Sequence, residues 1–241
     1  MKIIVLNSTN YQDKDTIIDA ICEDKTISFK VRSGQVPNSA HAWLNTPLTV
    51  AEVEYVDNPR YVNKVLKGAS LLFCPLRDND YLSLLSVNYA KEIATKMLSE
   101  EDRYKLFDTL LAYIKTTVAR PNNLLAKLIL MAKAITLAGS KLEVNQCVFC
   151  GSTKDIVNFS FREGGFICRK CMVEDIPIDL NPYQMKLIRS IFTREITDNL
   201  PEESIKIEDK ETLLIKLTEY VKDAIGVILD SPKFILDNLR R

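Results

Sequence analysis

The chain has 241 residues, of which 46% are hydrophobic and 27% charged, a composition typical of a globular protein of about two or three domains. Basic and acidic residues balance at 32 each, which argues against a simple basic DNA-binding protein, because clustered Lys and Arg drive phosphate binding. No apolar run approaches the roughly 18 residues of a spanning helix, and the first residues do not resemble a secretory signal. We therefore expect a cytoplasmic protein that does not enter the membrane.

Residues 1–78 have the pattern of short strands. Residues 2–6 are mostly β-branched, and apolar and polar residues alternate over 27–32 and 51–55. Such alternation is typical of strands that are buried on one face. Several short strands in so short a segment predict a small β barrel. The OB-fold is a common barrel of this size, and an SH3-like barrel is the alternative.

A helical period replaces the strand pattern after Asp80. Ser99, followed by three acidic residues, predicts the start of a helix that Pro121 ends. Residues 123–138 are apolar on most sides, which indicates the central helix of a bundle, and Gly139 is placed to end it. Further helices are expected over 183–196, over 209–229 and from Ser231 onward.

Four cysteines interrupt the helical pattern with the spacing C-x2-C-x17-C-x2-C: Cys147, Cys150, Cys168 and Cys171. Two such pairs on tight turns can direct four thiolates at one ion, and this spacing is typical of structural zinc sites. An iron–sulfur or other metal site, or a redox dithiol, is the alternative. Because four thiolates close the coordination shell, we expect one structural Zn²⁺ ion rather than a catalytic one.

The fold class predicted from these patterns is α+β. An OB-type barrel over 1–78 is followed by a helical domain over 79–145 and 179–241, into which a four-cysteine zinc module over 146–178 is inserted. The sequence contains one histidine and neither a phosphate-binding glycine loop nor a catalytic serine or zinc-protease motif. We therefore expect no catalytic residues and no enzyme activity.

Two groups of basic residues are candidates for binding surfaces. Tyr11, Lys14, Lys30 and Arg32 lie in the barrel region, where basic groups beside exposed aromatics could contact phosphates and stack on bases. A solvated strand face explains them equally well. Lys127 and Lys133 lie on the apolar helix, where a lysine can extend past a core or can line a groove for a partner's acidic tail.

The cysteine segment closely resembles the zinc segment of bacterial RecO proteins. In that family C-x-x-C-G is followed by F-S-x-x-x-G-G-x-x-C-x-x-C, and residues 146–152 and 159–171 have this pattern. The apolar helix that ends at 137–139 precedes it as in the family. The opening residues 4–18 and the closing residues 231–236 are similar to the family's two ends, so the resemblance covers nearly the whole chain.

The resemblance implies an N-terminal OB-fold, a helical domain and a zinc module. It further implies a nucleoid-associated DNA-repair protein of homologous recombination that binds single- and double-stranded DNA and anneals complementary strands. The implied partners are RecR and the C-terminal tail of single-stranded DNA-binding protein, with which it helps load RecA on gaps. By position, Lys127 resembles a basic residue of the groove that receives this tail.

The sequence departs from the family after the strand expected at Ile27 to Val31, where RecO proteins carry a run rich in Lys and Arg. In the corresponding segment of this sequence, residues 30–39, only Lys30 and Arg32 are basic. We therefore expect this protein to depend more on partner complexes than on its own phosphate contacts. The alternatives are a zinc-ribbon factor that binds RNA or assists transcription or translation, a pure interaction scaffold, and a metalloenzyme.

Overall fold

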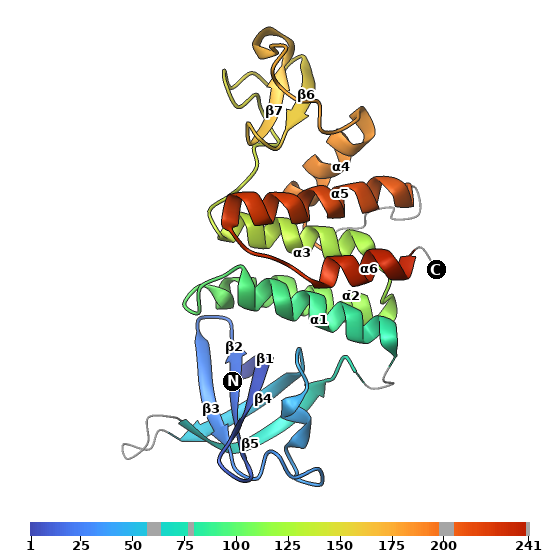
Figure 1. Ribbon diagram of the computed structural model, residues 1–241. Coiled ribbons are helices and arrows are strands. Elements are labelled where there is room, and N and C mark those ends of the chain that lie inside the picture. Colours follow the sequence, from blue (N-terminus) through green and yellow to red (C-terminus); the bar gives the residue numbers. More distant parts are fainter. Residues whose placement is uncertain (57–63, 77–79, 198–204, 240–241) are drawn as a thin grey trace. The chain divides into compact units, whose positions relative to one another are not determined.

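The computed structural model describes residues 1–56, 64–76, 80–197 and 205–239. The chain forms two compact units, residues 1–123 and residues 124–241 (Figure 1). The first contains a β barrel and two helices, and the second contains the four-cysteine module and the remaining helices. The predicted α+β class, with an N-terminal barrel, helices and an inserted cysteine module, is confirmed. The predicted domain boundary at 78 falls within 77–79, outside the described residues, and the other boundaries stay predictions.

The barrel has five strands: β1 (Lys2–Tyr11), β2 (Asp15–Ile21), β3 (Thr26–Val31), β4 (Val50–Val56) and β5 (Lys64–Phe73). Their order is β1-β2-β3-β5-β4, and antiparallel pairing of β1 with β4 closes the barrel. β3 and β5 are parallel, and the other neighbours are antiparallel. This five-stranded Greek-key order is that of the OB-fold, which decides between the two barrels that the sequence allowed.

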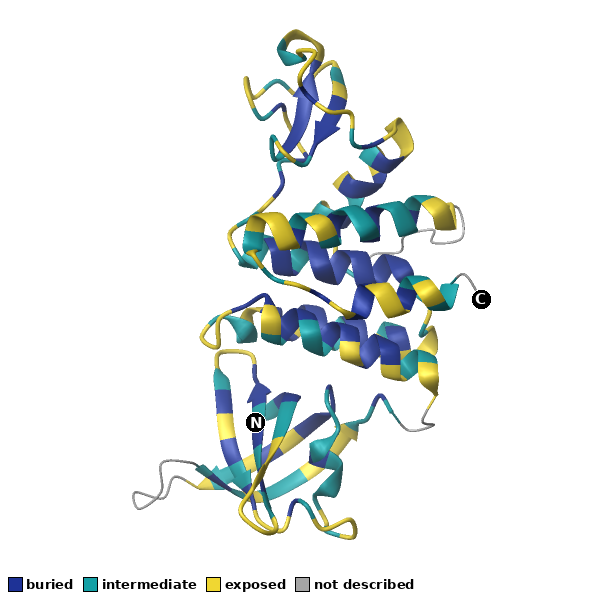
Figure 2. Ribbon diagram, in the orientation of Figure 1, coloured by how far each residue is buried: buried dark blue, intermediate teal, exposed yellow. Residues whose placement is uncertain are grey.

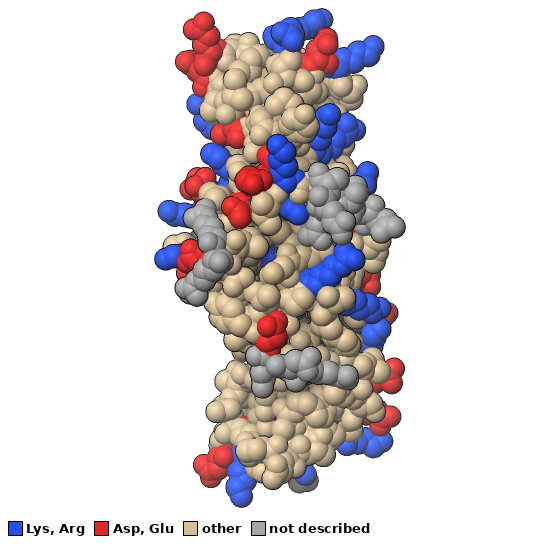
Figure 3. Space-filling view, turned by 90° about the vertical axis from the view of Figure 1, so that its right-hand side faces the viewer, with Lys and Arg blue, Asp and Glu red and all other residues tan. Residues whose placement is uncertain are grey.

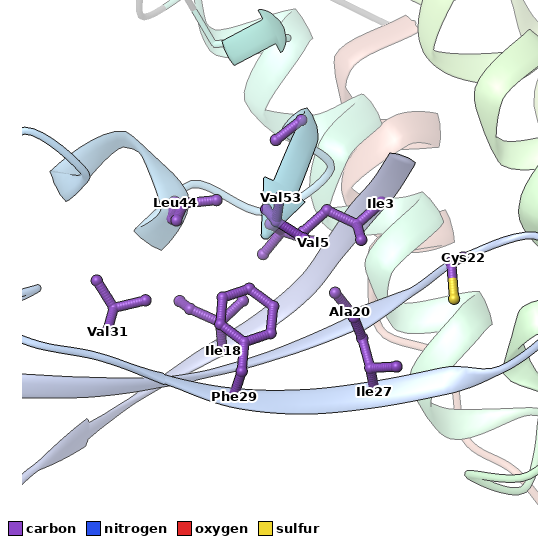
Figure 4. Packing of buried hydrophobic residues seen from close by; sticks show 11 residues of the cluster. Ile3, Val5, Ile18, Ala20, Cys22, Ile27, Phe29, Val31, Leu44 and Val53 are labelled. Atoms are coloured by element: carbon purple, nitrogen blue, oxygen red, sulfur yellow. The ribbon is translucent and has the colours of Figure 1, made fainter. Parts of the chain in front are cut away.

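Alternating side chains of the strands fill the barrel. Ile18 and Phe29 are fully buried on β2 and β3, and Val5 from β1 and Val53 from β4 point toward them (Figure 4). Leu44, on the short 3-10 helix η1 (Ala42–Asn45), contributes to the same cluster and is also fully buried. The polar residues between these positions face outward, so the period of two in the sequence corresponds to the two faces of the sheet.

Two helices complete the first unit, α1 (Tyr81–Lys96) and α2 (Phe107–Ala119). The carboxylate of Asp80 caps α1 by accepting from the Ser83 N–H at 3.0 Å. The prediction that Ser99 caps the next helix is wrong. The Ser99 hydroxyl donates to the Asp102 carboxylate at 2.9 Å, and a 3-10 turn, η2 (Arg103–Leu106), precedes α2. The helix therefore begins at Phe107, although it ends before Pro121 as predicted.

The second unit is built around α3 (Leu124–Leu137), which packs against α4 (Pro182–Thr193) and α5 (Ile207–Tyr220). α3 is buried along most of its length, as its apolar sequence predicts (Figure 2). Gly139 ends it with φ +82°, and the Ser140 N–H bonds back to the Ile135 carbonyl at 3.1 Å, which satisfies a carbonyl at the helix end. Asn181 caps α4 in a capping box with Gln184.

Two predicted helix ends lie further along the chain than the structure places them. α5 continues as a π-helical turn, η5 (Val221–Ile225), and Gly226 ends it with φ +78°, so residues 226–229 are not helical. α4 likewise ends at Thr193 rather than at 196. The apolar period continues past both ends, but a glycine in the left-handed region ends α5 first. The last helix, α6 (Ser231–Leu239), begins where Ser231 predicted it.

Candidate metal centre and nucleic-acid interface

Two CxxC loops place four sulfur atoms beside a short antiparallel hairpin, β6 (Ile156–Ser160) and β7 (Gly165–Cys168). Cys168 ends β7 and Cys171 ends the 3-10 turn η3 (Arg169–Cys171), whereas Cys147 and Cys150 precede the hairpin. The four Sγ atoms lie within 4.8 Å of one another, and those of Cys150 and Cys168 are 3.6 Å apart. Tetrahedral Zn–S bonds of about 2.3 Å separate the sulfurs by about 3.8 Å. The predicted cysteines therefore form a cluster that could hold a metal ion.

The first CxxC loop is a tight turn closed by its own backbone. The Gly151 N–H donates to the Cys147 carbonyl at 2.9 Å, and the Cys147 N–H donates to the Ser152 carbonyl at 2.8 Å. Gly151 has φ +70°, a conformation that glycine adopts without steric penalty. The glycine after the second cysteine thus lets the chain turn back while both thiols face the same side.

Gly165 allows the segment that carries the first CxxC loop to lie close to β7, which carries the second. The Phe166 N–H donates to the Glu143 carbonyl at 2.9 Å, and the Val148 N–H donates to the Phe166 carbonyl at 2.8 Å. The segment that enters the module therefore runs along β7 and carries its cysteines to the end of that strand. A Cβ atom on Gly165 would lie 2.2 Å from the Glu143 carbonyl oxygen, so only glycine permits this approach.

The local electrostatics favour a bound cation. Burial acts to raise the pKa of the Cys147 thiol, but backbone N–H groups of Cys168 and Cys150 donate to its sulfur and hold that pKa at about 6. Hydrogen bonding with the Cys150 sulfur, together with burial, raises the pKa of Cys171 to about 12. Four adjacent sulfurs cannot all be thiolates without a compensating positive charge. A divalent ion would supply that charge, and a donor set of four sulfurs fits zinc.

Aromatic side chains pack the hairpin. The ring of Phe159 contacts those of Phe161 and Phe166 edge to face, with centroids 5.0 and 5.6 Å apart. Phe159 and Ile167 are fully buried. Phe161 also contacts Tyr220 of α5, with centroids 5.7 Å apart, which ties the hairpin to the helices of its own unit.

The four candidate nucleic-acid residues gather at one end of the barrel. Tyr11 ends β1, Lys14 lies in the turn to β2, and Lys30 and Arg32 lie at the end of β3. The Lys30 ammonium is 5.8 Å from the Tyr11 ring centroid. Tyr11 is 40% exposed, and Lys14 and Arg32 are exposed as well. The face in Figure 3 carries Lys and Arg intermingled with Asp and Glu, so no single sign of charge covers it.

The carboxylate of Asp15 organises this end of the barrel. The Asp15 carboxylate pairs with the Lys30 ammonium at 3.1 Å and accepts from the Ser33 N–H at 2.9 Å. The Ser33 N–H and the Lys30 ammonium hold the pKa of Asp15 below its ordinary value, against the opposing effect of burial. Lys30 is therefore already engaged within the barrel, and Lys14 and Arg32 are the more accessible cations.

The sequence model of the family described as "Recombination protein O C terminal" matches residues 78–231. This chain belongs to the recombination protein O family. It is similar to proteins named DNA repair protein RecO over 96% of its length. That of Halalkalibacterium halodurans is 25% identical with 92% of its own length covered, and that of Shouchella clausii is 28% identical with 91% covered. The one from Bacillus subtilis is 23% identical with 91% covered. The predicted resemblance to RecO proteins is confirmed.

The two lysines of α3, Lys127 and Lys133, differ in how far they are buried. Lys127 is buried, with 2% of its surface exposed. The Lys133 ammonium lies 3.2 Å from the carboxylate of Glu195, and 39% and 58% of the two side chains are exposed. Glu195 follows α4 and is 62 positions away in sequence, so no sequence pattern points to it.

Two further cysteines lie outside the cluster in this RecO-family chain. Cys22 is buried in the barrel core, whereas Cys74 is only half-buried. Over the described ranges, no helix has the length and apolar character needed to cross a bilayer.

Proposed function

We propose that this protein is a non-enzymatic DNA-repair protein of homologous recombination. It binds single- and double-stranded DNA, anneals complementary strands and, together with RecR, helps load RecA on gaps coated with single-stranded DNA-binding protein. The observation that carries the proposal is the similarity to RecO proteins over 96% of the chain, combined with an OB-type barrel and a four-sulfur cluster. Such a protein acts in the cytoplasm at the nucleoid.

In this proposal one Zn²⁺ ion is held by the sulfurs of Cys147, Cys150, Cys168 and Cys171. When bound, the ion supplies positive charge that stabilises four thiolates and cross-links the two loops. The residues themselves bring the sulfurs together through the turn at Gly151 and the pairing of Val148 with β7. The role of the ion is structural, because its four protein ligands leave no position for a substrate.

The proposed DNA surface of the barrel is its end formed by Tyr11, Lys14, Lys30 and Arg32. Exposed Lys14 and Arg32 contact phosphates, and the exposed ring of Tyr11 stacks on a base. Lys30, which pairs with Asp15, orients the tyrosine ring and adds positive potential. With so few cations at this end, the contribution of the barrel to affinity is modest.

The acidic tail of single-stranded DNA-binding protein is proposed to bind along α3 at Lys133 and Lys127. The Lys133 ammonium already holds the exposed carboxylate of Glu195, so a tail carboxylate could take the place of that side chain. Buried Lys127 contributes positive potential from within the helix. On this account Glu195 competes with the tail.

The test is fluorescence anisotropy with a labelled single strand at two salt concentrations. Replacing Arg32 with Glu should weaken binding and lower the salt slope by about 0.7, the value for one phosphate contact on single strands. Lys25→Glu is the matched control, because Lys25 is another exposed cation, in the β2–β3 turn of the same barrel. Equal losses in the two variants would remove the barrel end from the proposal.

The tail is tested with a labelled peptide of the C-terminal residues of single-stranded DNA-binding protein. Lys133→Ala should weaken its binding, whereas Glu195→Gln should strengthen it because the competing carboxylate is removed. Unchanged binding in both variants would place the tail elsewhere. A protein that binds neither the tail nor DNA, but binds RNA, would be a zinc-ribbon factor of the alternative class.

A further inference from the structure

Acidic and basic side chains lie at opposite ends of the β6–β7 hairpin. At its turn, Arg162 pairs with Glu163 at 2.7 Å and donates to the Asp175 carbonyl at 2.9 Å. The Asp179 carboxylate accepts from the Phe161 N–H at 2.8 Å and lies at the same end. Within the module, the turn therefore carries the carboxylates of Glu163 and Asp179 against the single cation Arg162, which is already paired, and Asp179 also lies 3.9 Å from the Lys216 ammonium of α5.

The opposite end of the hairpin, beside the sulfur cluster, has the reverse balance. Ile156 pairs with Cys168 there, and the Arg169 N–H donates to the Asp155 carbonyl at 2.9 Å. The loops at this end expose the side chains of Lys154, Arg169 and Lys170, against the single acid Asp155. Although residues 145–180 as a whole are slightly acidic, the sulfur end is therefore locally basic.

The same end exposes an aromatic ring. Phe149 lies between the first two cysteines and is 53% exposed, whereas Phe159 and Phe166 of the same module are buried. Arg169 and Lys170 occupy the equivalent positions between the other two cysteines. The sulfurs of Cys150 and Cys168, each one residue from Phe149 or Arg169, are 3.6 Å apart. The ring and the two cations therefore lie on neighbouring loops, within reach of one short ligand.

From this juxtaposition we infer that the sulfur end of the module, formed by Phe149, Lys154, Arg169 and Lys170, binds single-stranded DNA. Phe149 stacks on an unpaired base, and the three cations contact the phosphates beside it. An aromatic face among cations is the chemistry that recognises single strands without sequence preference, because every base has a stacking face. The inference rests on the proposed function and adds a second DNA contact, remote in sequence from the barrel end.

The experiment uses the full zinc-loaded chain and a fluorescent thymine oligonucleotide of about 15 nucleotides, near the upper site size of one OB-fold. Phe149→Ala should weaken binding by about five- to 150-fold, the range measured for one base–aromatic stack. The double variant Arg169→Glu, Lys170→Glu should lower the salt slope by about 1.4, because two phosphate contacts are lost. Zinc content is measured in each variant.

The matched control is the double variant Lys222→Glu, Lys233→Glu. It makes the same change in net charge at two exposed lysines outside the module. Control affinity close to that of the unaltered protein, with a large loss in the module variants, supports the inference. Equal affinities in all variants overturn it but leave the proposed function standing. An unaltered protein that does not bind the strand contradicts the proposed function itself.

A spectroscopic readout covers the case in which the charge variants lose zinc. Phe149→Trp is combined with Trp43→Phe, which removes the only natural tryptophan. Stacking should quench the fluorescence of the new indole when the strand binds. Binding seen by anisotropy without quenching would overturn the inference.

Discussion

The barrel and the cysteine module are both built on β structure, but different interactions hold them together. The barrel closes five strands around a cluster of 11 buried residues (Figure 4). The module has two strands of five and four residues, and a two-stranded hairpin is marginally stable at best in water. Apolar burial stabilises the first region, whereas the second has little apolar core, and its stability is proposed to depend on an ion held by its four sulfurs.

The largest expected effect is therefore metal removal. Chelation should unfold the module, because apparent binding free energies of structural zinc are about 10–16 kcal/mol and add directly to folding. Cys168→Ala should have the same effect, since its sulfur is buried within the cluster. Hydrogen exchange should show loss of protection over residues 145–178, while β1–β5 stay protected. Protection that is unchanged in the module would mean that its aromatic core suffices without metal.

A core substitution in each region gives the next effect. Phe29→Ala should destabilise the barrel by about 3–5 kcal/mol, because it removes a fully buried ring. It should leave zinc affinity unchanged, as measured by competition with a chelating dye. Phe159→Ala, the matched change in the module, should weaken zinc binding because the hairpin that presents the sulfurs loses its central ring. Equal effects of the two variants on zinc would contradict the separation of the regions.

A single methyl group should disrupt the path into the module. Gly165→Ala places a Cβ against the Glu143 carbonyl oxygen and should cost more than about 2 kcal/mol in the free energy of unfolding. Gly164→Ala is the control, since no atom lies within 4 Å of its Cβ position and only its φ of +83° is unfavourable, at about 1 kcal/mol. Thermal melts in the presence of zinc distinguish them. A more damaging Gly164→Ala would mean that the approach of Glu143 does not position the first loop.

The smallest expected effect is the loss of stability at low pH that follows from protonation of Asp15 at the barrel end. The folded pKa of Asp15 is lowered, chiefly by the Ser33 N–H with help from Lys30, so its contribution is present above its ordinary value of 3.8 and is lost as the pH falls through the folded pKa. Asp15→Asn should remove this part of the pH dependence, at a cost of about 1 kcal/mol or less. Melting curves from pH 6 to about pH 3 measure it. If the melting temperature of the variant fell with pH in the same way as that of the unaltered protein, the contacts of Asp15 with Ser33 and Lys30 would not contribute to stability.

The cysteine cluster could be predicted because the spacing of the four cysteines in the sequence is itself typical of a metal site. The two CxxC pairs and the glycines at 151 and 165 lie within one short segment, and each has a local conformational requirement. The strands with clean alternation and the helix end at Gly139 were predictable for the same reason.

The features that could not be predicted depend on distant partners. The barrel order requires β3 to lie beside β5, a parallel pairing that alternation within one strand does not encode. The pairing of Lys30 with Asp15 follows only from the register of β2 and β3, and that of Lys133 with Glu195 follows from the packing of α3 on α4. The helical period was predicted to begin after Asp80, but no helix was predicted over α1, because its apolar residues do not form one clean stripe: Tyr81 and Leu84 are exposed, whereas Tyr89 is buried.

Annealing of DNA without a chemical step can be measured by mixing complementary labelled single strands with the zinc-loaded chain and no nucleotide cofactor. We expect that the protein accelerates duplex formation, that the DNA strands remain chemically intact, and that the acceleration falls with added salt. Duplex formation at the rate of the protein-free control, at low salt and with zinc bound, would contradict this expectation.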